Sequence, residues 1–276
     1  MKEKRFVQIG SNVEKAVQGD YSLDVPAILK EGWALTQKNK QSILSGLSFI
    51  LLIGVIITLV ASEYMGGIEQ VMQDNQKQML LNFLITVLLW PFIAGIEMMG
   101  ISHAVGIKTR TGFVFAFLKR SAFIAMAALI ITLISTLIIG SIVSFLGLLK
   151  IDPSLINFVT VIVGLILTIF LSASIPLIVE KNMTPILSII LSVKAIRFQW
   201  LKLLQIYSVF ILLAILTLLP GLIGIPPILS FFIFLVALFF LAPFYYNVKG
   251  ILYREIFGVQ MQVIDNNGDQ DMFFSA

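Results

Sequence analysis

The sequence predicts an all-α integral membrane protein with six membrane-spanning helices. Of the 276 residues, 58% are apolar and 12% are charged, and the mean hydropathy is +0.99. Soluble globular domains contain about 45–50% apolar and about 25% charged residues. Because so few charges cannot cover that much apolar side chain in water, the composition excludes a soluble fold.

Uncharged stretches mark the spans. Lys40 and Glu63 enclose 22 uncharged residues, and Arg120 and Lys150 enclose 29. A helix rises about 1.5 Å per residue, so about 20 residues cross a hydrocarbon core of about 30 Å. Long continuous apolar runs favour helices over the short, alternating strands of a membrane barrel. The predicted helices are 42–62, 79–103, 121–149, 155–180, 201–222 and 227–250.

The last two helices form a hairpin. Lys202 and Lys249 enclose 46 uncharged residues, which are too many for one span. Glycines and prolines cluster at residues 220–227, and this composition predicts a turn.

The basic residues predict the orientation. Seventeen of the 19 Lys and Arg residues lie before the first span, in or next to the second and fourth connections, or at and after the end of the last span. Only Lys77 and Lys150 lie on the other side. Cytoplasmic loops carry the excess of Lys and Arg, so both termini are predicted to be cytoplasmic.

A loose internal repeat predicts three hairpins, each preceded by an amphipathic interfacial helix. Asp24-Val25-Pro26 and Thr184-Pro185 are helix-start signals, and each precedes a stretch that ends in basic residues. Residues 34–52 align on 195–213, including Phe-Ile-Leu-Leu in both. The predicted regions are a cytoplasmic segment with an interfacial helix (1–41) and a short helix near 12–18, a six-helix domain (42–257) and an acidic flexible tail (258–276).

The residue types leave little room for catalysis. The chain has one histidine and no cysteine, which excludes thiolate metal sites and cysteine nucleophiles. It has no Gly-rich phosphate loop and no nucleic-acid-binding motif. We therefore expect a protein that is not an enzyme, with no cofactor, no metal and no nucleic-acid partner.

Glu97 and His103 are the candidate intramembrane polar site. Glu97 lies inside the apolar stretch of the second helix, where a carboxylate is costly unless it is paired, protonated or in contact with water. It indicates either proton coupling or the lining of a substrate path. The alternatives are an ion pair with a loop Lys or Arg, or solvation at the interface. For His103, the alternative is an interfacial histidine at a loop start.

Four basic residues are candidate contacts for lipid head groups, anionic ones included. Lys194 and Arg197 lie three residues apart, on one face of a predicted interfacial helix, and Lys119 and Arg120 precede the third span. The alternative is that these charges only orient the chain.

Three prolines are candidate helix hinges. Pro91, Pro176 and Pro243 lie in the second, fourth and sixth helices. Proline is frequent in membrane helices, so ordinary packing is the alternative explanation.

Two segments carry a resemblance to a known family. Residues 176–181 (Pro-Leu-Ile-Val-Glu-Lys) are followed by Ser188, Ser192, Lys194 and Trp200, and Leu252-Tyr253-Arg254 follows the last span. This pattern resembles the bacterial YciC-like group, which is similar to the membrane domain attached to some glycerophosphodiester phosphodiesterases. The resemblance implies a six-span protein of the bacterial cytoplasmic (inner) membrane. The phosphodiesterase activity is not implied, because it belongs to a soluble barrel domain with paired histidines and metal-binding carboxylates.

Together these features predict a non-enzymatic protein that binds or transports a lipid or other amphiphile, with membrane lipids as its partners. The alternative is a structural scaffold or stabilising subunit of another inner-membrane complex, which requires a membrane-protein partner. A cavity reaching Glu97 would favour the first hypothesis, because the scaffold needs none.

Overall fold

The computed structural model describes residues 4–266 and 269–274. Six apolar helical segments in this part of the chain are long enough to cross a membrane, as the sequence predicts, so the protein is a multi-pass membrane protein. The spans are α2 (Val25–Tyr64), α4 (Asn75–Ala104), α5 (Ser121–Leu148), α6 (Pro153–Leu171) with α7 (Ser174–Glu180), α9 (Trp200–Leu222) and α10 (Pro227–Phe257). The shorter elements are α1 (Val13–Gln18), α3 (Ile68–Gln73), α8 (Pro185–Ile196), the 3-10 helices η1 (Thr111–Phe115) and η2 (Leu118–Arg120), and strands β1 (Lys4–Ile9), β2 (Val259–Asn266) and β3 (Asp269–Phe274).

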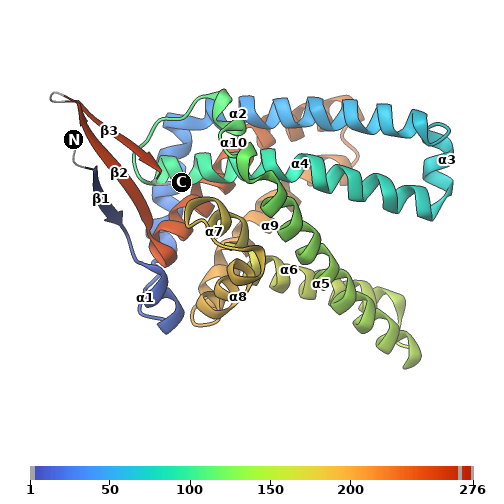
Figure 1. Cartoon of the computed structure of the whole chain (residues 1–276). Helices are drawn as coiled ribbons and strands as arrows, with labels where there is room; N and C mark the ends of the chain where they lie inside the picture. The colour runs from blue at the N-terminus through green and yellow to red at the C-terminus, as the bar shows by residue number, and fades with distance from the viewer. Residues whose placement is uncertain (1–3, 267–268, 275–276) are drawn as a thin grey trace.

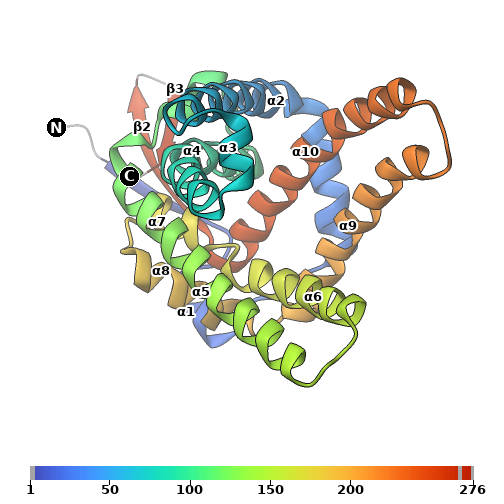
Figure 2. The ribbon, with the colours of Figure 1, turned by 90° about the vertical axis from the view of Figure 1, so that its right-hand side faces the viewer.

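The spans form three helical hairpins, α2 with α4, α5 with α6, and α9 with α10. Figures 1 and 2 show that the hairpins diverge toward the end where α3 lies. The strands, α1 and α8 lie toward the opposite end (Figure 1), which we call the basic end because the predicted cytoplasmic Lys and Arg belong to it. Most buried side chains also lie toward this end, where α10 packs against α2 and α4.

The first predicted interfacial helix is not a separate element. The Asp24 carboxylate accepts a hydrogen bond from the Ala27 backbone N–H at 3.1 Å and caps the start of α2. The helix then continues for 40 residues through the predicted boundary at 41 and 42, because no proline or glycine interrupts residues 33–45. Its first part runs across the bundle and its remainder runs beside α4 (Figure 1). In the second repeat, two 3-10 helices replace the expected amphipathic helix.

Pro176 breaks the fourth predicted helix into α6 and α7. A proline has no backbone N–H, and its ring crowds the carbonyl four residues earlier. Ser192 of α8 satisfies the interrupted backbone, because its hydroxyl donates to the Phe170 carbonyl at 2.7 Å and accepts from the Ala173 N–H at 3.3 Å. By contrast, α4 and α10 continue through Pro91 and Pro243. Hinge motion at the three prolines remains a prediction.

Two glycines let α4 and α10 cross in backbone contact. A Cβ atom on Gly100 would overlap the Tyr246 carbonyl, and one on Gly250 would overlap the backbone of Gly100. Small residues at such crossings allow helices in membranes to approach closely. This contact packs the second and sixth spans against each other beside the candidate site.

The two terminal segments pair in one small antiparallel sheet. Strand β1 pairs with β2, and β2 pairs with β3. This differs from the flexible tail expected over 258–276, of which residues 267–268 and 275–276 lie outside the described part. The short helix expected near 12–18 is confirmed as α1.

The N-terminal segment is also tied to α8. The Tyr21 hydroxyl donates to the Ala195 carbonyl at 2.8 Å, and burial raises the pKa of Tyr21 to about 12. The Gln199 side chain bridges the backbone of Tyr21 and Leu23. These contacts fix the segment before α2 against the basic end.

Candidate functional site

A buried ion pair joins the second and sixth spans. The Lys249 Nζ atom of α10 lies 2.5 Å from Glu97 Oε1 of α4, and Glu97 is only 5% exposed. Of the alternatives for Glu97, an ion pair is therefore the one observed, but its partner lies on a helix rather than in a loop. A pair buried in this way needs good geometry to offset the loss of hydration.

The pair lines a cavity between the spans. This cavity has a volume of about 310 Å³ and is bounded by α4, α5, α6, α7 and α10. Ser135, Thr168, Ser172 and two tyrosines give it polar groups, while its remaining wall is apolar and includes Trp90. We call it the central cavity. Its lining combines an apolar surface with a few convergent polar groups, as ligand sites in proteins commonly do.

The other carboxylate oxygen of Glu97 is unsatisfied. Glu97 Oε2 is buried and has no hydrogen-bond partner among the described residues. Glu97 and Lys249 also line a second, enclosed space of about 20 Å³ that Tyr207 and Tyr253 help to close. A buried carboxylate oxygen without a partner is rare, so this acceptor is available to a donor that enters from either space.

His103 lies outside this pair, in a separate buried network. It is 2% exposed, and its Nδ1 lies 2.8 Å from Asn247 Oδ1. The Asn247 amide donates in turn to Thr36 at 3.0 Å, and Thr36 donates to the Gly32 carbonyl at 2.8 Å. This network links α2, α4 and α10, so Glu97 and His103 do not form one site. His103 lies in the last turn of α4, at the start of the loop as expected, and Asn247 gives it a buried partner.

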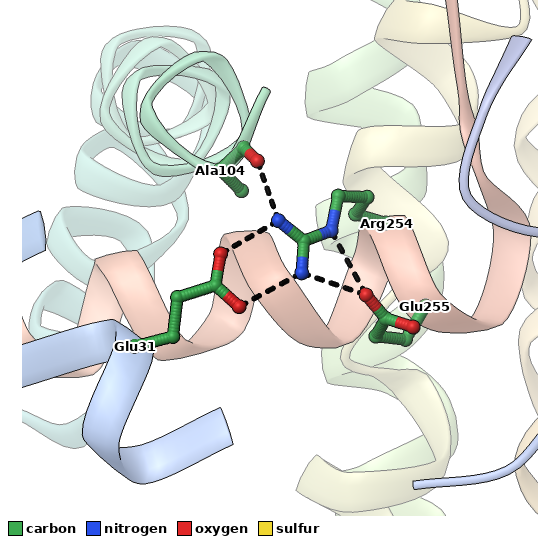
Figure 3. A network of polar contacts seen from close by, with 4 residues as sticks. All are labelled: Glu31, Ala104, Arg254 and Glu255. Carbon is green, nitrogen blue, oxygen red and sulfur yellow. Dashed lines mark hydrogen bonds and ion pairs between the residues drawn. The ribbon is translucent and has the colours of Figure 1, made fainter. Parts of the chain in front are cut away.

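Arg254 connects three segments at the basic end (Figure 3). Its guanidinium makes two parallel hydrogen bonds to the Glu31 carboxylate at 2.7 and 2.9 Å, and a third to the Ala104 carbonyl at 2.6 Å. It also donates twice to Glu255, at 2.7 and 2.9 Å. This planar fork geometry is specific to arginine. It ties the start of α2 and the end of α4 to α10.

Glu180 anchors the strand that follows α10. Its carboxylate accepts from the Tyr253 hydroxyl at 2.9 Å and from the Gln260 backbone N–H at 2.8 Å, and Lys181 lies at 3.1 Å. Glu180, Tyr253 and Arg254 all belong to the segments that carry the family resemblance. In this structure they hold the fold together and do not line the central cavity.

The four predicted head-group contacts are separate from the central cavity. Lys119 and Arg120 lie in η2, Lys194 lies in α8, and Arg197 follows α8. Two of them stack on adjacent rings, Arg120 at 6.0 Å from the centre of the Phe123 ring and Arg197 at 4.7 Å from that of Phe198. Lipid contact at these residues remains a prediction.

Lys249 and Asn247 were not predicted as site residues. Lys249 was interpreted only as an orientation charge at the end of the last span. The available signal was Glu97 itself, because a carboxylate in an apolar helix requires a compensating cation. The crossing at Gly100 and Gly250 gave no signal, because glycine is common in membrane helices.

A third, mostly apolar cavity lies between α9 and α10. Its volume is about 480 Å³, and Trp33 of α2 closes one side. Lys40 lies over the nearby Phe240 ring, 4.3 Å from its centre.

No family model, no curated protein and no solved structure matches this chain.

Proposed function

We propose that the protein binds, or moves across the bilayer, an amphiphile whose polar group enters the central cavity and reaches Glu97 and Lys249. The single observation that supports this proposal is the cavity of about 310 Å³ with the buried pair in its wall. Its apolar lining suits a hydrocarbon segment, and Glu97 Oε2 accepts a hydrogen bond from the polar group. We also propose that the protein lies in the bacterial inner membrane and is a member of the YciC-like family.

The scaffold alternative explains this site less well. A protein that only stabilises a complex needs no cavity between its own helices. Packing density at a purely structural contact matches that of other protein interiors, whereas here the spans leave space around a buried charge pair. The scaffold hypothesis therefore becomes an outcome of the test.

The test places a larger side chain in the wall of the central cavity. Ser135→Leu adds a larger apolar side chain on α5 at the cavity lining, and Ser141→Leu makes the same change at an exposed position of that helix. The amphiphiles that co-purify with each protein are extracted and quantified per mole of protein by mass spectrometry. We expect Ser135→Leu to lose at least half of one lipid species that Ser141→Leu retains.

Equal lipid profiles in the two variants, both with the thermal stability of the wild type, would contradict the proposal. A stoichiometric membrane-protein partner that remains bound to both variants in mild detergent would then favour the scaffold.

A further inference from the structure

A fourth cavity opens at the basic end and shares no lining residue with the central cavity. It lies between α2 and the loop that joins α4 to η1, and its volume is about 460 Å³. Lys38 of α2 and Lys108 and Arg110 of the loop line it, and none of its nine lining residues is acidic. We call it the Lys38–Arg110 pocket.

The three cations of this pocket have no ion-pair partner among the described residues, unlike Lys249 and Arg254. Like charges gathered in one pocket repel each other, and an anion bound between them relieves that repulsion. The charge of the pocket therefore favours an anionic ligand.

Four hydroxyl-bearing residues line the pocket. Ser45 Oγ and Thr111 Oγ1 lie 2.7 Å apart, and the Thr109 hydroxyl donates to Ser42 Oγ at 3.1 Å. Beneath them, Nε2 of the buried His103 lies 2.8 Å from Thr109 Oγ1. The hydroxyl protons are already donated within the protein, because Ser42 and Ser45 also donate to the Asn39 and Ser42 carbonyls. The Lys and Arg side chains are therefore the donors available to the acceptor oxygens of a phosphate group.

The loop that carries two of the cations is held in place by the end of α4. Gly106 has a φ of +84°, and the Ile107 N–H donates to the Ser102 carbonyl at 2.8 Å. The Gly106 N–H donates to the His103 carbonyl at 3.1 Å, and Arg254 donates to the Ala104 carbonyl. These bonds form a glycine-dependent helix cap. The carbonyls that would repel an anion are thus already hydrogen-bonded.

From this arrangement we infer that the Lys38–Arg110 pocket binds a phosphate group, with Arg110 and Lys108 as its main charged contacts. The pocket lies where the charged part of α2 gives way to the apolar part, which is the level of lipid phosphates in a bilayer. The same chemistry suits the head group of an anionic phospholipid and free phosphate. The inference goes beyond the proposed function and uses none of the residues of the central cavity.

The experiment uses the full chain, purified in a neutral detergent, and two probes. One probe is inorganic phosphate and the other is a water-soluble short-chain phosphatidylglycerol, and binding is measured by isothermal titration calorimetry. Lys108→Gln with Arg110→Gln removes one Lys and one Arg from the pocket. Lys15→Gln with Lys30→Gln removes two positive charges at exposed positions outside the pocket and serves as the control.

We expect the pocket variant to weaken binding by at least about tenfold and the control variant by less than about twofold, because hydrogen bonds to charged groups each change affinity by about tenfold or more. Binding of inorganic phosphate would identify a soluble ligand. Binding of phosphatidylglycerol alone would identify a lipid head group. Ser45→Leu, which fills the pocket and keeps every charge, is expected to weaken binding as the double variant does.

Three results would overturn the inference. The first is that neither probe binds the wild-type protein. The second is that the two double variants weaken binding equally, which would indicate a diffuse basic surface. The third is that Ser45→Leu binds as tightly as the wild type. All four substituted residues, Lys15, Lys30, Lys108 and Arg110, are exposed, so the thermal unfolding midpoints of both double variants should match that of the wild type.

Discussion

The Glu97–Lys249 pair makes a quantitative prediction about stability. Lys249→Met removes the cation and leaves a carboxylate that is 5% exposed without its partner, and Glu97→Gln leaves the ammonium group in the same position. Breaking one side of a buried pair costs about 3–5 kcal/mol, whereas replacing both partners with neutral residues is often close to neutral. We therefore expect each single variant to lose about 3–5 kcal/mol of unfolding free energy.

The double variant Glu97→Gln with Lys249→Met is expected to recover most of that loss, which gives a coupling energy of at least about 3 kcal/mol. Unfolding is followed by tryptophan fluorescence in mixed micelles with a rising fraction of SDS, since Trp90 lines the central cavity beside the pair. Glu69→Gln, the same substitution at an exposed position, serves as the control and should change stability by less than about 0.5 kcal/mol.

Additive losses of less than about 1 kcal/mol for each single variant would refute this reasoning. Such values are typical of exposed ion pairs. They would mean that water or lipid head groups reach both charges in the folded protein.

Three further predictions follow from the packing and the charge distribution. Gly100→Ala should lower the free energy of unfolding by at least about 1–3 kcal/mol, because its methyl group must separate two backbones. Gly140→Ala, which faces open space, should not lower the thermal unfolding midpoint. Arg254→Lys keeps the charge but loses the paired hydrogen bonds to Glu31. In SDS unfolding, its free energy of unfolding should therefore be lower by about 1–3 kcal/mol. Because the chain has no cysteine, cysteines placed at Glu69 and Lys119 report orientation cleanly. A membrane-impermeant maleimide should label only Glu69→Cys in intact cells, and labelling at both positions or at Lys119→Cys alone would contradict the predicted topology.

Local sequence patterns predicted the helices well, but they predicted poorly where one helix ends and the next begins. The six spans were found because apolar runs of this length have few alternatives. The separate first interfacial helix was wrong because a change from charged to apolar residues does not end a helix unless a cap or a breaker stops it. The proline alone does not explain the helix break before Pro176, because α4 and α10 continue through Pro91 and Pro243. Ser192 of another helix satisfies the freed backbone groups.

The candidate site was predicted in part. Glu97 was identified because an intramembrane carboxylate is costly wherever it lies in a span. Its partner was not, because Lys249 is 152 positions away in the chain and a terminal lysine serves orientation equally well. His103 was grouped with Glu97 by proximity in sequence, yet its partner is Asn247 of α10.

The sequence by itself determined that this protein is a six-span helical membrane protein, because length, hydropathy and charge are local properties that the bilayer tests one segment at a time. Only the tertiary structure decided which charges meet, which glycines let two helices touch, and where the spans leave space. Those features depend on contacts between residues far apart in the chain, and the composition of a single segment does not encode its partner. The central cavity and the Lys38–Arg110 pocket both arise at such contacts.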